Sequence, residues 1–276
     1  MNDLAAFATL VQALDPWRGQ LVFIGGWAHR LHRLHPLSQP LDWQPVFTRD
    51  SDLAFADRAP LAGDIRAALM GHGFKEELAG EFRPPVAHYT LGGHGAGFYA
   101  EFLTPLIGSG RKRNGEPDAT TTAAGISAQK IRHLDILLID PWVITLGPDA
   151  EISVPQPRDI QVANPLCFMV QKFLIQEDRS ANKRAQDLLY LYDTVQVFAD
   201  QLLEFNRCWH HTVAPALAGY GGHDLIVQRV ALESFAKVSD TLRNAARIPQ
   251  DRQIDPEELR LTCQLAFDLI FAPIAA

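Results

Sequence analysis

The segments FIGGW (residues 23–27) and TRDSDLAF (residues 48–55) decide the fold that the sequence predicts. Residues 20–24 form a short apolar strand pattern, and Gly25-Gly26 allows a sharp turn into a helix over residues 27–35. A second strand is predicted over residues 50–55, and alternation puts Asp50 and Asp52 on one of its faces. Paired carboxylates repel each other unless a cation lies between them, and oxygen ligands of this kind suit Mg²⁺ with its waters and substrate phosphates. The pattern therefore predicts a metal site of the kind that serves phosphoryl transfer.

The Gly-Gly turn has two interpretations. The first N–H groups of the following helix point back toward the turn, so a phosphate could bind there. Alternatively, the two glycines only make a tight connection between a strand and a helix. The acidic strand that follows favours the phosphate interpretation.

Bulk composition sets limits on the protein's class. Its 276 residues, of which 47% are hydrophobic and 21% charged, suffice for one large or two ordinary domains. A net charge of −7 argues against a general nucleic-acid coat, because such binding neutralises phosphates, although a local basic groove is compatible with it. Buried thiols in a reducing compartment are indicated for Cys167, Cys208 and Cys263. Since neither a signal-peptide pattern nor an apolar span of about 20 residues is evident, we expect a cytoplasmic protein without membrane contact.

The remaining pattern predicts an α+β domain over residues 1–160 and a helical domain over residues 161–276. In the first domain we expect helices over residues 3–14, 61–73 and 126–134, and strands over residues 81–91, 97–103, 136–140, 142–146 and 151–154. A turn over residues 92–97 would join the first two of these strands into a hairpin. After a proline-rich boundary, helices are predicted over residues 166–175, 182–195, 198–209, 223–236 and 256–271.

Glu101 lies on the otherwise apolar strand pattern of residues 97–103. A buried carboxylate costs several kcal/mol unless it is paired or bound to a metal. We therefore expect Glu101 beside Asp50 and Asp52. The alternative is a glutamate at a strand edge with its carboxylate in water.

Several basic residues and histidines are further candidates. Lys172 lies in an apolar helix, where its amine either extends to water at the helix edge or points at an anion, and Arg179 and Lys183 precede Asp187 on the next predicted helix. The glycine-rich segment 108–122 is either a loop over the site or a solvated insertion, and its cations are Arg111, Lys112 and Arg113. A metal site is disfavoured for His29, His32 and His35, because their helical spacing drifts and no cysteine or acid accompanies them.

The order of these features resembles the minimal nucleotidyltransferase fold over residues 20–195. That order is a strand, a Gly-Gly turn, a helix, an Asp-x-Asp strand, a third acid on a later strand, and a helical part that carries Lys172. Within this superfamily the chain is most similar to AbiEii/MenT-type toxin nucleotidyltransferases of toxin–antitoxin and phage-defence loci. The resemblance implies an α+β fold in which a mixed sheet with flanking helices precedes a C-terminal helical domain.

The resemblance also implies a reaction and roles for the candidate residues. A nucleoside monophosphate would pass from a nucleoside triphosphate to an acceptor hydroxyl, with Mg²⁺ as cofactor, and the acceptor could be tRNA or another RNA. A cognate antitoxin protein is an implied partner. By this resemblance Gly25 and Gly26 contact the phosphates, and Asp50 and Asp52 bind Mg²⁺. Glu101 completes the metal site or takes the proton. Lys172 binds the triphosphate, and Arg179 and Lys183 bind the triphosphate tail or RNA.

The chain departs from the family pattern in three ways. Asp50 follows Gly26 by 24 residues, a longer interval than usual, so residues 36–48 are expected to be an insertion. Gly26 stands where serine is commoner, and Glu101 stands in place of aspartate. Two alternatives stay open: a catalytically silent nucleotide-binding or protein-interaction module, and an aminoglycoside-type enzyme acting on a small molecule. A Glu101 that lies far from the Asp pair would favour the silent module. An acidic patch that could receive a cationic substrate would favour the aminoglycoside-type enzyme. A basic segment 108–122 that faces the site would favour an RNA acceptor.

Overall fold

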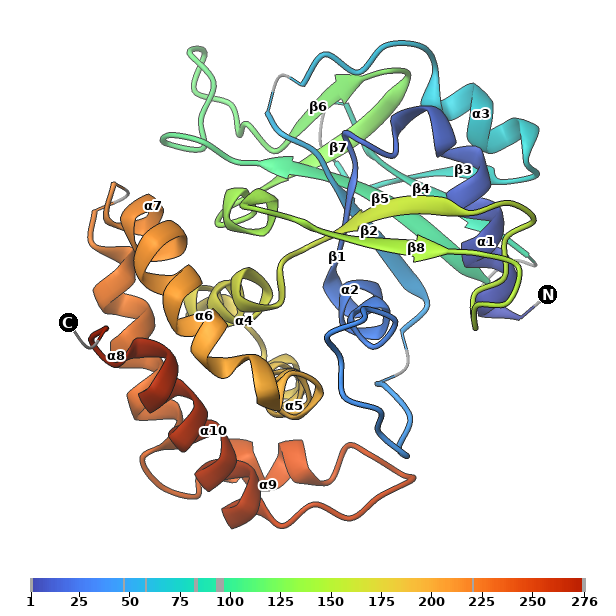
Figure 1. The fold of residues 1–276 in the computed structure, drawn as a ribbon. Helices are drawn as coiled ribbons and strands as arrows, with labels where there is room; N and C mark the ends of the chain where they lie inside the picture. Colours follow the sequence, from blue (N-terminus) through green and yellow to red (C-terminus); the bar gives the residue numbers. More distant parts are fainter. Residues whose placement is uncertain are drawn as a thin grey trace. The chain divides into compact units, whose positions relative to one another are not determined.

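The structure is a computed structural model that describes residues 2–46, 48–57, 59–81, 84–92, 97–219 and 221–274. The chain divides into two compact units, Met1–Leu31 with Phe47–Asn164 and His32–Val46 with Pro165–Ala276. The first unit holds the sheet, and the second consists of helices together with the segment 32–46 (Figure 1). The predicted α+β class and the helical C-terminal part are confirmed.

A mixed sheet forms the centre of the first unit. Its main path runs in the order β3-β4-β5-β2-β1-β9-β8, and β7 pairs with both β5 and β6. Three of these pairings are parallel, namely β2 with β5, β5 with β7 and β1 with β9. The bounds of the strands are β1 (Val22–Ile24), β2 (Asp50–Ala54), β3 (Lys75–Ala79), β4 (Val86–Leu91), β5 (Phe98–Pro105), β6 (Thr120–Ala123), β7 (Ile126–Ile131), β8 (Trp142–Leu146) and β9 (Arg158–Val162).

An aromatic cluster attaches the helices of the first unit to the sheet. The helix α1 (Asp3–Ala13) begins at Asn2, whose side chain accepts a hydrogen bond from the Ala5 N–H at 2.8 Å. Its Phe7 stacks on Trp27 of α2 (Gly25–His32) with ring centroids 4.1 Å apart, and both rings meet Phe98 of β5 edge-on. All three side chains are buried. The cluster therefore holds the start of α2 close to the strand that carries Glu101. The helix α3 (Ile65–Gly71) packs on α1.

Three elements predicted for the first unit are wrong. Residues 126–134 form strand β7 instead of a helix, because Ile126 and Ala128 alternate with more exposed neighbours. A 3₁₀ helix (Asp135–Leu138) replaces the strand predicted over residues 136–140. Residues 151–154 form no strand, and the strand in this region is β9. The turn predicted over residues 92–97 lies partly outside the described residues.

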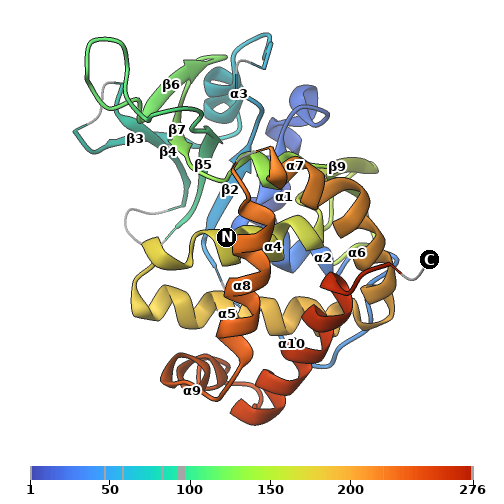
Figure 2. The same cartoon turned by 90° about the vertical axis from the view of Figure 1, so that its left-hand side faces the viewer.

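Seven α-helices are described in the second unit, and their bounds are α4 (Pro165–Leu174), α5 (Ala181–Val197), α6 (Leu202–Cys208), α7 (Ala214–Ala218), α8 (His223–Phe235), α9 (Asp240–Ala246) and α10 (Pro256–Phe271). Figure 2 shows α8 running beside α10, with which it is in contact. The predicted helices match α4, α5, α6, α8 and α10 in position, although α6 is shorter than expected. Two short helices, α7 and α9, were not predicted. No helix in the described part of the chain is long and apolar enough to cross a membrane.

The segment 32–46 packs within the second unit through a stack of cations on one tryptophan. The guanidinium carbons of Arg33 and Arg252 lie 4.6 and 3.4 Å from the ring centroid of Trp43. Arg252 also pairs with the buried Asp193 at 2.5 Å. The Gln44 N–H donates to the Asp251 carboxylate at 2.7 Å. Residues 36–46 of the predicted insertion thus belong to the helical unit.

Candidate functional site

Three acidic side chains share one face of the parallel strands β2 and β5. The register pairs Asp50 with Tyr99 and Asp52 with Glu101. Residues that are paired across a sheet point to the same face, so all four side chains lie on one side. They are partly exposed, whereas the alternate residues, Ser51, Leu53, Ala100 and Phe102, are buried on the other side. The structure thus brings Glu101 next to Asp52.

The pKa values of this face report the mutual influence of the acids. Burial, followed by the charges of Asp50, Glu101 and Asp52, raises the pKa of Tyr99 to about 12. Burial also raises the pKa of the Glu101 carboxyl, His88 opposes that rise, and the Asp50 charge adds to it. The face therefore favours a bound cation or a proton, since either reduces the repulsion.

His88 of β4 holds the Glu101 carboxylate from the other side. The two residues are register partners, and His88 Nε2 lies 3.1 Å from Glu101 Oε1. The His88 ring also stacks on Tyr99, with centroids 5.5 Å apart and planes 25° apart. Neither His88 nor Tyr99 was predicted as a site residue. Their alternation with buried neighbours was visible in the sequence, but the strand register that places His88 opposite Glu101 was not.

Gly25 brings the start of α2 against the acidic strand. Strand β1 ends at Ile24, which pairs with Asp52, and α2 begins at the next residue. Gly25 has a φ of 65°, and a Cβ atom added to it would lie only 2.2 Å from Asp52 Oδ2. Gly26 is the second residue of α2 and is partly exposed. The first N–H groups of a helix have no partner within that helix, so this turn offers donors to an anion next to the Asp52 carboxylate.

The donor set can be tested against Mg²⁺. Within the described ranges, no group of three or more His, Cys, Asp or Glu side chains is close enough to form a ready-made metal site. Mg²⁺ is usually held by one or two carboxylates, with substrate phosphates and waters in the remaining positions. Asp50 and Asp52 supply such a pair, and Thr48 Oγ1 donates a hydrogen bond to Asp50 Oδ1. The residues therefore fit a magnesium ion that binds together with nucleotide phosphates.

The candidate phosphate-binding cations lie in the second unit. Lys172 Nζ is 3.0 Å from Asp187 Oδ1, and Arg179 Nε is 3.2 Å from Asp187 Oδ2. The Lys172 and Asp187 side chains are only 6% and 3% exposed. The Lys172 amine also lies 5.0 Å from the ring centroid of Phe168. Lys172 thus points at an anion, the Asp187 carboxylate. Lys183 is exposed and contacts Gln186 instead.

The basic segment forms a small hydrogen-bonded turn in the first unit. The Lys112 N–H donates to the Glu116 carbonyl at 2.8 Å, and Arg111 forms an isolated bridge with Pro117. Arg111 and Arg113 are both exposed. The turn therefore presents cations to solvent.

Comparison with known proteins gives one family. A family model described as nucleotidyltransferase matches residues 2–214, more than three quarters of the chain. Comparisons with curated proteins and with solved structures gave no match.

Proposed function

The chain belongs to the nucleotidyltransferase family, and on that premise we propose that it moves a nucleoside monophosphate from a nucleoside triphosphate to an acceptor hydroxyl with the help of Mg²⁺. The surroundings of Asp52 support this proposal most directly. Its carboxylate lies against Gly25 at the start of α2, and its register partner is Glu101. A phosphate donor site, a metal ligand and a proton acceptor thus have candidates at neighbouring positions.

The proposed reaction is an in-line displacement at the α-phosphorus. The acceptor oxygen forms a new bond to the α-phosphorus while the bond to the bridging oxygen breaks and pyrophosphate leaves. The acceptor proton passes to Glu101, whose raised pKa suits a proton acceptor better than an ordinary carboxylate. Mg²⁺ on Asp50 and Asp52 would neutralise phosphate charge and acidify the acceptor. The N–H groups of Gly25 and Gly26 bind phosphate oxygens.

Lys172, Arg179 and Lys183 are proposed to bind the triphosphate. Lys172 and Arg179 both lie against the carboxylate of Asp187, so these three residues gather two cations around one acid. Surroundings of low polarity strengthen the attraction of cations for an anion. Lys183 adds an exposed cation one helical turn before Asp187.

We propose RNA, with tRNA as the first candidate, as the acceptor. The support is the pair of exposed arginines, Arg111 and Arg113, on the turn of the basic segment. Cations on an exposed turn bind a phosphate backbone without reading its sequence. A toxin role with a cognate antitoxin, and a cytoplasmic location, follow from the family resemblance and the sequence pattern alone.

The test is label transfer from nucleoside triphosphates that carry ³²P at the α or the γ position, with Mg²⁺ and total tRNA. We expect the wild type to transfer the α label but not the γ label. Asp52→Ala should transfer neither, while the matched control Asp149→Ala, at an exposed aspartate outside the site, should behave as wild type. If the wild type labels no RNA, protein or small-molecule acceptor, the proposed activity is wrong. Nucleotide binding without transfer would support the silent module.

A further inference from the structure

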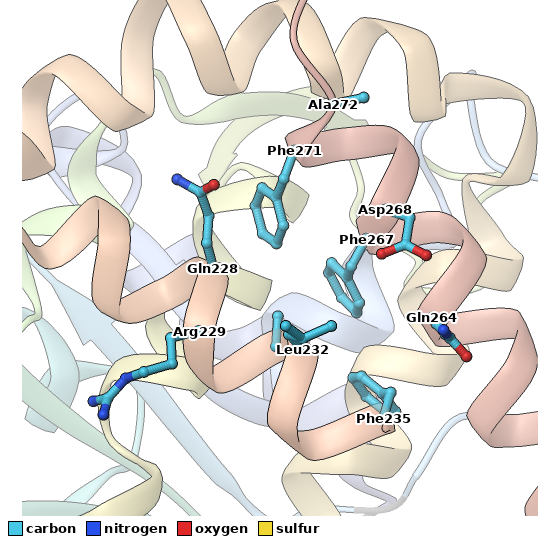
Figure 3. Close-up of a pocket in the computed structure, with 10 residues that line it drawn as sticks. Gln228, Arg229, Leu232, Phe235, Gln264, Phe267, Asp268, Phe271 and Ala272 are labelled. Atoms are coloured by element: carbon cyan, nitrogen blue, oxygen red, sulfur yellow. The ribbon is translucent and has the colours of Figure 1, made fainter. Parts of the chain in front are cut away.

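A groove between α8 and α10 takes no part in the proposed reaction (Figure 3). It encloses about 400 Å³. Three buried or partly buried rings form its floor: Phe235 of α8 stacks on Phe267 of α10 at 5.7 Å, and Phe267 stacks on Phe271 at 5.9 Å. Its rims carry exposed side chains, among them Leu232 on α8 and Asp268 on α10. The groove is therefore an apolar trough that is open to solvent.

Both helices also carry exposed leucines, of which Leu232 lines the groove. On α8, Leu225 and Leu232 are seven residues apart and 67% and 62% exposed. On α10, Leu261, Leu265 and Leu269 follow one another at intervals of four residues, so each set forms one stripe. These five are among twelve exposed large apolar residues in the described ranges. Such a concentration is typical of an interaction surface, because single exposed leucines are normally scattered.

Two opposite charges on the rims are suited to pairing with a second copy of this chain. Arg229 lies on the α8 side and Asp268 on the α10 side, and both are exposed. Neither forms an ion pair or hydrogen bond with the part of the chain that the structure describes. A second copy related by a two-fold axis could lay its α10 on α8 and its α8 on α10. Each Arg229 would then meet the Asp268 of the other copy, and leucine stripes would cover each other.

We infer that α8 and α10 form a two-fold interface between two copies of this chain. A two-fold interface must be complementary to itself, and a patch with leucines on both helices and opposite charges on its two rims meets that requirement. The result would be a four-helix contact with the phenylalanine groove closed at its centre. Both helices lie beyond residue 214, where the family match ends, so the inference does not depend on the proposed reaction.

The experiment measures the mass of the full-length chain by light scattering and sedimentation over a wide range of concentrations. We expect a mass twice the 30.6 kDa of one chain, falling toward one chain on dilution. The double variant Leu232→Glu/Leu265→Glu should remain a monomer with unchanged circular dichroism. Leu78→Glu, at a leucine that is also 62% exposed but lies on β3, serves as the matched control and should dimerise as wild type.

A charge exchange tests the proposed pairing. Arg229→Asp and Asp268→Arg should each weaken self-association by roughly ten-fold or more. In a two-fold dimer either change places residues 229 and 268 of like charge opposite each other at two equivalent contacts. The variant with both changes should recover most of the wild-type affinity. A wild type that stays at 30.6 kDa at every concentration overturns the inference, whatever else binds the groove. A dimer that survives the double leucine variant, or that the charge exchange fails to restore, also overturns it.

Discussion

Replacing Gly25 by alanine should displace the Asp52 carboxylate without unfolding the protein. The new Cβ would lie 2.2 Å from Asp52 Oδ2, whereas unbonded carbon and oxygen atoms rarely come closer than about 3.3 Å. The carboxylate must therefore retreat by roughly 1 Å, a displacement that can lower catalytic rates about 100-fold. The φ of 65° adds a strain of about 1–2 kcal/mol for alanine, which a domain of ordinary stability survives.

The matched control is Gly221→Ala. Gly221 also has a positive φ, 83°, but nothing lies within 4 Å of the Cβ that alanine would add. Both variants should lose similar stability from backbone strain, and only Gly25→Ala should lose about 100-fold in α-label transfer. Equal activities of the two variants would refute the argument that Asp52 is displaced.

A double-variant cycle checks the cause by thermal unfolding. In an Asp52→Ala background the obstructing carboxylate is gone, so Gly25→Ala should cost less stability there than in the wild type. Additive losses in the midpoint of unfolding would show that the effect of Gly25→Ala does not pass through Asp52.

Three further predictions concern partnered groups. Asp187→Asn leaves the buried Lys172 without its carboxylate, so it should lower the free energy of unfolding by about 3–5 kcal/mol. Denaturant titrations measure this loss, and a loss below about 1 kcal/mol would contradict the buried pair. Burial raises the pKa of Asp193 from 3.8 to about 7 against the effect of its arginine partner, so the folded state holds a proton there that the unfolded state releases. The free energy of unfolding should thus fall as the pH rises between these two pKa values. Asp193→Asn should make stability depend less on pH, as thermal melts at several pH values would show. His88→Ala should reduce transfer by releasing the Glu101 carboxylate, and His88→Gln should restore part of it; equal activity of all three proteins would exclude a positioning role.

Local sequence signals predicted the elements that carry the site. The strand before Gly25, the helix after it and the Asp50–Asp52 strand depend on patterns a few residues long, and the structure contains all three. The long helices α5 and α10 have strong periodicity and were equally predictable. Strand β7 was missed because its alternation is short and one of its two buried positions is Ala128, and alanine is the residue with the highest helix propensity.

Contacts between distant strands could be predicted only in part. Glu101 was expected beside Asp50 and Asp52 because a buried carboxylate needs a partner. The parallel register of β2 and β5 that pairs it with Asp52 is encoded by no local spacing. His88 enters the site through the register of a hairpin. The partner of Lys172 was also invisible, because the ion pair with Asp187 depends on how α4 packs on α5.

The path of the chain between the glycine turn and the acidic strand limits the order in which the two units can fold during synthesis. The chain passes between the two units three times, and residues 32–46 belong to the helical unit although they are made early. Since a ribosome delivers the N-terminal part first, Trp43 must wait until Arg252, its stacking partner, has been synthesised much later. Strands β1 and β2 can pair before then, with the unfinished segment looped out between them. A chain cut after residue 164 would therefore keep every acid of the site and still not be a self-contained domain.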